Sequence, residues 1–152
     1  MRLSVKSAYG ILAALDLALQ NGEAPVQARA IARRQAIPLR FLEQVLASMK
    51  KAGLVESLRG AKGGYLLRKS PSTISLAEIV EALDGPLLHS SARGPYAGEG
   101  NGRRLSVPES LLTQVWERVR QAELAVLSGI TLKELSDRHQ TLQQQRSPMY
   151  HI

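Results

Sequence analysis

Residues 31–65 read IARRQAIPLRFLEQVLASMKKAGLVESLRGAKGGY, and this stretch decides the fold that we expect. It predicts a short helix, a tight turn, a second helix that ends at a glycine, and a glycine-rich hairpin. Pro38 suits the first turn of the second helix, and Gly53 stands just past its end. The apolar residues of the second helix recur at steps of three or four, which is one face of an α-helix; they are Leu39, Leu42, Leu46 and Met49.

The opposite face of this second helix is polar and basic. It carries Arg40, Glu43, Gln44, Ala47, Lys50 and Lys51. A helix that is buried on one side and offers Arg, Gln and Lys on the other suits the major groove of DNA. Near its start, Gln44 can bond adenine, Arg40 can bond guanine, and Glu43 can accept from cytosine. For the helix taken alone, a solvated amphipathic surface is the open alternative.

The segment behind the helix predicts a basic hairpin. Residues 54–59 alternate like a strand, residues 60–64 turn, and residues 65–68 return. Arg59 and Lys62 lie at or beside the tip of this hairpin. A recognition helix followed directly by a basic two-stranded wing is typical of a winged helix-turn-helix, and an ordinary hairpin with a basic tip is the alternative.

The helix ahead of the turn, expected over residues 27–35, would lie across the DNA backbone. Its outward arginines, Arg29, Arg33 and Arg34, would then contact phosphates, which gives affinity without sequence information. Lys6, in the first turn of a helix expected over residues 4–20, faces either a phosphate or solvent. The complete set that we expect at the DNA backbone is Lys6, Arg29, Arg33, Pro38, Lys50, Gly60, Lys62 and Gly63.

The charge of the chain is unevenly distributed. The net charge is +7; residues 1–70 hold twelve Lys and Arg against four Asp and Glu, whereas residues 71–152 hold eight against nine. The positive half therefore predicts a polyanionic partner, with nucleic acid first and an acidic membrane surface second. No stretch approaches the roughly 18 consecutive apolar residues of a membrane span, and Asp16 interrupts the apolar start, so we expect a cytoplasmic protein without a secretory signal.

Residues 107–128 predict the longest helix, which a capping box at Ser106 introduces. Such a helix spans roughly 33 Å, which is too long for the core of so small a domain. Its apolar seam has coiled-coil spacing and consists of Leu112, Val115, Val119, Ala122 and Val126, with Trp116 beside it. We expect the seam to form a homodimer interface; closure of a monomeric core is the alternative.

Two further helices complete the expected DNA-binding half. The helix over residues 4–20 begins at the N-cap Ser4, and a helix over residues 76–83 begins at Ser75, with Glu78 as the other half of a capping box. The expected inward stripe of the first helix is Leu12, Leu15 and Leu19.

The predicted fold is mainly α with a small β-wing: a winged helix-turn-helix domain followed by a long C-terminal dimerisation helix. We expect the DNA-binding domain over residues 1–84. Residues 85–106 contain five glycines and show no helical or strand periodicity of apolar residues, so we expect a flexible loop there. The dimerisation helix and a short last helix would occupy residues 107–138, followed by a polar tail over residues 139–152.

In three stretches the sequence resembles the Rrf family of bacterial transcriptional regulators. They are MRLSVKSAYGILAALDLAL at the start, IPLRFLEQVLASMKKAGLVESLRGAKGGYLL, and ISLAEIVEALDG. The resemblance covers residues 1–85 closely and the later helices loosely. It implies sequence-specific binding to double-stranded DNA, and Arg59 matches the family position whose arginine enters the minor groove. Because a homodimer presents two recognition helices about one DNA turn apart, the operator should be an imperfect palindrome.

The iron–sulfur members of that family hold a cluster with three cysteines in the region that corresponds to residues 85–106, and this chain contains no cysteine. Disulfides, thiolate metal sites and cysteine nucleophiles are thereby excluded. His89, His139 and His151 lack ligand spacing, although a metal site of His89 with Glu99, or of His89 with His139 of a partner chain, is the alternative. We expect no cofactor, no metal and no enzymatic activity, and regulation through an unknown small ligand or partner protein that orders the loop.

Two other functions are open at this point. A protein-interaction or scaffold domain of the same fold need not bind DNA, and an RNA-binding module would share the basic half. Duplex DNA binding with a steep dependence on salt separates the regulator from both.

Overall fold

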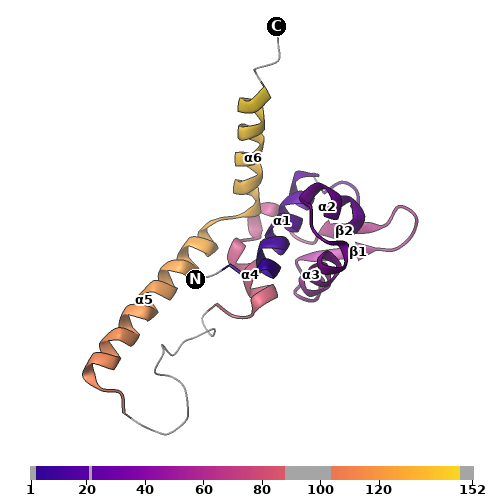
Figure 1. Cartoon of the computed structure of the whole chain (residues 1–152). Helices are drawn as coiled ribbons and strands as arrows, with labels where there is room; N and C mark the ends of the chain where they lie inside the picture. The colour runs from indigo at the N-terminus through magenta and orange to yellow at the C-terminus, as the bar shows by residue number, and fades with distance from the viewer. Residues whose placement is uncertain (1–2, 21, 88–103, 148–152) are drawn as a thin grey trace.

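The computed structural model describes residues 3–20, 22–87 and 104–147 (Figure 1). Its elements are, in order, α1 (Val5–Leu19), α2 (Ala28–Gln35), α3 (Leu39–Lys51), β1 (Val55–Leu58), β2 (Gly64–Leu67), the 3-10 turn η1 (Pro71–Thr73), α4 (Leu76–Asp84), α5 (Val107–Gly129) and α6 (Leu132–Arg146). In Figure 1 the hairpin projects from one side of the α1–α4 bundle and α5 extends from the other. The prediction of a mainly helical fold with a small antiparallel sheet is confirmed. None of the described helices is both long and apolar enough to cross a membrane.

Helix α1 packs against α2, α3, α4 and α6, and the stripe that we predicted for it is only partly correct, because Leu15 packs against the core but Leu12 does not. Leu12 is 38% exposed. The buried positions of α1 are instead Ser7, Gly10, Ala13, Ala14, Asp16, Leu17 and Ala18. Small residues are buried where neighbouring helices come close: a Cβ added at Gly10 would lie 2.1 Å from Cδ1 of Leu83. The Ser4 cap is confirmed, since its hydroxyl accepts the N–H of Ser7 at 2.9 Å.

The turn between α2 and α3 depends on one left-handed residue. Ala36 has φ 52° and ψ 42°, a conformation that costs an L-residue about 1–2 kcal/mol. The next residue, Ile37, donates its N–H to Ala32 O at 3.0 Å and is 4% exposed, so its side chain fills the space between the two helices at the turn. Pro38 lies at the N-cap of α3 rather than in its first turn, and its carbonyl accepts the N–H of Leu42 at 3.0 Å.

The end of α3 fixes the direction in which the wing leaves the helix. Gly53 has φ +77° and donates its N–H to Lys50 O at 3.0 Å. Leu54 donates to Met49 O, also at 3.0 Å, and both of these side chains are buried. This pair of bonds is a Schellman motif, in which glycine takes the left-handed position. The predicted glycine stop is confirmed, and β1 follows it without a linker.

The hairpin is shorter than we predicted, because its turn takes up residues 59–63. Strands β1 and β2 are antiparallel, with Leu58 opposite Gly64. Tyr65 and Val26 exchange two backbone hydrogen bonds, of 2.8 and 2.9 Å, so the base of the wing is attached to the α1–α2 connection. Gly64 permits this approach, since its φ is +155° and an added Cβ would lie 2.5 Å from the Val26 carbonyl carbon.

The bend between α5 and α6 is attached to the start of α4. Leu76 donates its N–H to Ile130 O at 2.9 Å, and Leu132 donates to Ile74 O at 3.0 Å. Leu132 is fully buried in the same core cluster as α1, α3 and α4. The start of α6 therefore packs as part of the N-terminal core, although it follows the long helix in sequence.

The C-terminal helices differ from the prediction in one respect. Helix α5 has 23 residues and begins with the expected capping box of Ser106 and Glu109. The prediction of a short last helix with a polar tail from residue 139 is wrong, because α6 continues to Arg146. Its glutamines and leucines are good helix formers, and i,i+4 ion pairs of the kind formed by Lys133 with Asp137 support it. Of the predicted flexible loop, residues 88–103 lie outside the described part.

Candidate nucleic-acid interface

Helix α3 presents one polar face to solvent. Arg40, Glu43 and Gln44 are all exposed in its first half. The buried side of the helix consists of Leu42, Val45, Leu46 and Met49, where the sequence pattern had missed Val45. At its start, Phe41 packs edge-to-face on Tyr9 of α1 with ring centroids 5.3 Å apart. The helix is thus fixed from behind, and the three polar side chains are free to meet a partner.

The turn of the hairpin carries two exposed cations. Arg59 and Lys62 are separated by Gly60 and one alanine. Gly60 has φ +112°, and its carbonyl accepts the N–H of Gly63 at 3.0 Å. A Cβ added at Gly63 would lie 2.2 Å from Leu58 O, so the turn is tight enough to require glycine there.

A lysine connects the recognition helix with the wing. The Lys50 ammonium, in the last turn of α3, donates to the hydroxyl of Ser57 on β1 at 2.6 Å. Lys50 and Lys51 are both exposed and lie at the negative end of the helix dipole. Positive charge therefore continues from α3 across the Schellman turn to the hairpin.

The three arginines of α2 do not share one role. Arg29 and Arg33 are exposed, as the sequence suggested. Arg34 instead donates from Nε and Nη2 to Asp16 Oδ1 and Oδ2, at 2.9 and 2.7 Å. Gln35 adds a bond of 2.9 Å to Oδ1. Our expectation that Arg34 points outward to phosphate is therefore wrong: it satisfies a carboxylate that is only 2% exposed.

The sequence contains one signal for the ion pair of Asp16 and Arg34. A lone Asp in an apolar helix face requires a donor when the helix is buried, and Asp16 interrupts such a face. The hydrogen bond to Asp16 raises the pKa of Arg34 above its ordinary value, against the opposing effect of burial. Arg34 therefore remains charged and joins α2 to α1 behind the recognition helix.

Lys6 lies in the first turn of α1 and is half-buried. Two serines near it in sequence, Ser4 and Ser7, donate hydrogen bonds to Asp84, with Ser4 Oγ at 2.8 and 2.7 Å from the two carboxylate oxygens. The Ser7 hydroxyl lies 2.6 Å from Oδ2. Asp84 is the last residue of α4, so this end of α1 is attached to the segment that leads into residues 85–106.

The apolar seam of α5 is open to solvent in the single chain. No residue of α5 is buried. The side chains along the seam are 37–60% exposed: Leu112 37%, Val119 40%, Trp116 47%, Val115 53% and Val126 60%, and Ala122 is exposed as well. The half-buried Leu124 lies on the opposite side of the helix from the seam, and the half-buried Leu127 lies next to Trp116 at the edge of the seam. The seam thus faces away from the chain's own core.

A sequence profile of the Rrf2 family, described as "Iron-dependent Transcriptional regulator", matches residues 3–138. The chain belongs to the Rrf2 family. Among Rrf2 relatives, the helix-turn-helix regulator IscR of Photorhabdus laumondii is 37% identical over 142 residues, which cover 93% of this chain and 83% of the relative. The regulator CymR of Bacillus subtilis is 32% identical over 136 residues, which cover 90% of each chain.

Solved Rrf2 structures share the fold. CymR of B. subtilis, titled the global cysteine regulator, superposes with a TM-score of 0.74 at 31% identity and covers 91% of this chain and 98% of its own. IscR of T. potens superposes with a TM-score of 0.71 at 36% identity, and the match covers 91% of this chain and 88% of that chain. Like these relatives, the chain is a DNA-binding transcriptional regulator and not an enzyme, as the sequence predicted.

The iron named in the family description does not fit the donors of this Rrf2 chain. The sequence contains no cysteine, and soft thiolate ligands are what iron–sulfur clusters require. Within residues 3–20, 22–87 and 104–147, no three His, Asp or Glu side chains gather as a metal site. The chain therefore offers no thiolate for a cluster.

Proposed function

We propose that this Rrf2 regulator binds an imperfect palindrome in double-stranded DNA as a homodimer and acts in the bacterial cytoplasm. The observation that supports this most is the exposed face of α3, which the Schellman turn joins directly to a basic wing. In this proposal Arg40, Glu43 and Gln44 contact base edges in the major groove. Arg59 enters the adjacent minor groove.

The remaining cations supply affinity for the phosphates. Arg29 and Arg33 on α2 are exposed, as are Pro38, Lys50, Gly60 and Lys62, whereas Lys6 and Gly63 are half-buried. Neutralised phosphates release counterions, so operator affinity should fall steeply as salt rises. Residues 1–84, with the start of α6 packed against them, form the DNA-binding part in this proposal, and α5 forms the dimer arm.

The test is a mobility shift at two salt concentrations on genomic fragments and on duplex RNA. Specific duplex DNA binding that weakens steeply with salt supports the proposal. Equal affinity for duplex RNA would favour an RNA-binding module, and binding to neither would favour a scaffold.

Replacing Gln44 with Ala should cost about 1–3 kcal/mol of binding free energy on the operator and little on random DNA. The physical reason is that an amide bonding to a base edge discriminates sequence, whereas non-specific binding comes from the phosphates. Fluorescence anisotropy on both DNAs measures the difference. Equal losses on the two DNAs would show that Gln44 only positions the protein.

Replacing Arg59 with Ala should weaken binding most on operators with A·T-rich flanks. A narrow A·T-rich minor groove concentrates negative potential and attracts arginine. Arg68→Ala is the matched control, because Arg68 is an exposed cation just past the end of β2, away from the turn. If the Arg59 variant binds every flank as the wild type does, Arg59 does not contact the minor groove.

We also propose that operator binding in this chain is independent of an iron–sulfur cluster. The purified protein should be colourless, and dithionite, oxygen and nitric oxide should leave its operator affinity unchanged. Absorption spectra together with iron and acid-labile sulfide assays check this. Stoichiometric iron and sulfide that disappear together with DNA binding on oxidation would contradict it. If no cluster is present, as we propose, control acts through a small ligand or partner protein at residues 85–106.

A further inference from the structure

A cleft of about 470 Å³ opens between α1, the segment that follows β2, and α6. It shares no residue with the DNA-contact set or with the seam of α5. Its floor is apolar, with Leu17 from α1 and Leu67 from β2 among the residues that line it. The walls above this floor are polar and come from two segments far apart in sequence.

The α6 wall presents one face of the helix, on which Lys133, Ser136, Asp137 and Gln140 recur at helical spacing. Ser136 is only 7% exposed. Among the residues that the structure describes, none forms a hydrogen bond with its hydroxyl. The Ser136 hydroxyl oxygen is not sealed from solvent, so it is open to the cleft and can donate to a polar group that enters it.

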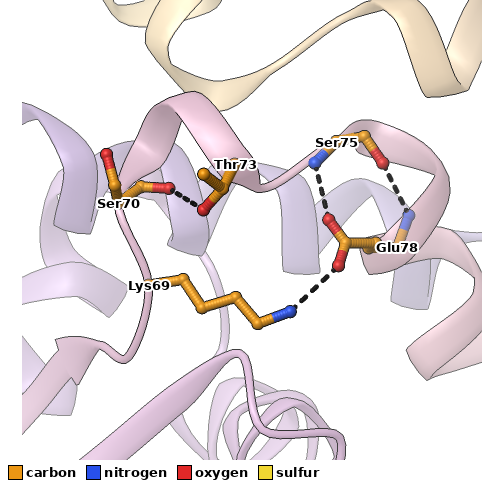
Figure 2. Close-up of polar contacts among 5 residues, drawn as sticks. All are labelled: Lys69, Ser70, Thr73, Ser75 and Glu78. Carbon is orange, nitrogen blue, oxygen red and sulfur yellow. Dashed lines mark hydrogen bonds and ion pairs between the residues drawn. The ribbon is translucent and has the colours of Figure 1, made fainter.

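The opposite wall is the segment after β2, which Figure 2 shows in part. The Ser70 carbonyl accepts the Thr73 hydroxyl at 2.8 Å, which holds the segment in its 3-10 turn. The hydroxyls of Ser70 and Ser72 lie 2.9 Å apart, and one donates to the other. Two hydroxyls that share one such bond retain one O–H, which is available to a further acceptor.

Each wall also contributes an ammonium group. Lys69 lies 3.1 Å from Glu78 (Figure 2), and Lys133 lies 2.5 Å from Asp137. Burial acts to raise the pKa of Glu78, but hydrogen bonds from the Ser75 N–H and from Lys69, with the lysine's charge, lower it overall. Both pairs are solvent-exposed and therefore weak, and an ammonium has three donors, so each lysine can bind a second anion.

We propose that this cleft is a binding site for a small organic anion, whose charged group lies between Lys69 and Lys133. The carbon skeleton of the anion lies on the apolar floor, and the hydroxyl of Ser136 donates to it from α6. Because the cleft joins the base of the wing to the helix that follows α5, a ligand that binds one arrangement of these elements better would favour that arrangement. The proposal does not depend on the operator or on dimerisation.

The test titrates the full ¹⁵N-labelled chain, without DNA, with three probes that share a three-carbon skeleton: glycerate, glycerol 3-phosphate and 3-phosphoglycerate. At least one should shift the amide signals of Ser136 and Ser70 saturably. Lys69→Gln and Lys133→Gln should each weaken the binding of that probe about tenfold, which is typical for loss of a charge-assisted hydrogen bond. The matched control is Arg138→Gln, since Arg138 is an exposed cation on α6 outside the cleft. It should change the affinity less than about twofold.

The probes distinguish the two sources of the anion. Saturable binding of glycerate identifies a carboxylate site, and saturable binding of glycerol 3-phosphate identifies a phosphate site. The proposal is overturned if no probe shifts the cleft amides at millimolar concentrations. It is also overturned if Arg138→Gln weakens binding as much as the cleft variants do, because the attraction would then come from the net positive charge alone.

Discussion

Replacing Val119 with Glu should convert the protein to a monomer and lower its operator affinity by about 10²–10⁴-fold. Val119 lies in the middle of the exposed seam of α5, between Val115 and Ala122. In the proposed dimer this position is buried against the partner helix, where an unpaired carboxylate is costly. A monomer has only one recognition helix. Linking two binding contacts raises affinity over a single contact by about 10²–10⁴-fold, so loss of the dimer should lower operator affinity by a similar factor.

Gln114→Glu is the control for this variant. Gln114 is an exposed polar residue of α5 that lies about a third of a helical turn away from the seam and from the half-buried side. It introduces the same carboxylate on the same helix and should leave both dimer and affinity unchanged. Sedimentation velocity measures the mass, and a mobility shift measures the affinity. A monomeric wild type, or a Val119 variant that remains a fully active dimer, would contradict the proposed interface.

Replacing Arg34 with Met should lower the free energy of unfolding by about 2–3 kcal/mol. Removing one partner of a buried ion pair typically costs about 3–5 kcal/mol, because the other charge is left in a medium of low polarity. We expect a smaller loss of stability here because the Arg34 side chain is 41% exposed and because Gln35 still donates to Asp16. In urea, at fixed protein concentration, this corresponds to a midpoint lower by roughly 1 M.

Arg33→Met is the control, because it removes the neighbouring exposed arginine and should change stability little. The double variant Asp16→Leu with Arg34→Met should recover much of the loss, since it removes both charges together. If the Arg34 and Arg33 variants unfold at the same urea concentration, the ion pair does not stabilise the fold.

The structure of the segments that we propose to contact DNA could be predicted because their signals are local. The apolar residues of α3 recur every three or four residues, and this spacing alone predicts a helix with one buried face. The left-handed Gly53 and the glycines of the hairpin likewise act within a few residues, so the sequence is enough to predict their effects. The capping boxes at Ser75 and Ser106 are local in the same sense. The exposed positions of Arg40, Glu43 and Gln44 followed from that periodicity.

The contacts that could not be predicted join segments distant in sequence. The stripe predicted for α1 assumed one buried face, whereas four helices surround α1 and bury its small residues. Arg34 was grouped with the outward arginines because nothing local shows that Asp16 lies beside it. Leu132, the first residue of α6, packs in the core formed by the N-terminal helices, although α6 follows the long helix α5 in sequence. The cleft beneath α6 depends on that packing and was not foreseen.

Base recognition by α3 is tested most directly by selecting bound fragments from bacterial genomic DNA and sequencing them, with the wild type and Gln44→Ala in parallel. The wild type should enrich one imperfect palindrome with half-site centres about 10 base pairs apart. The Gln44→Ala variant should lose the base preference at one position in each half-site. Fragments that share no sequence, or an identical palindrome selected by both proteins, would contradict base recognition by α3.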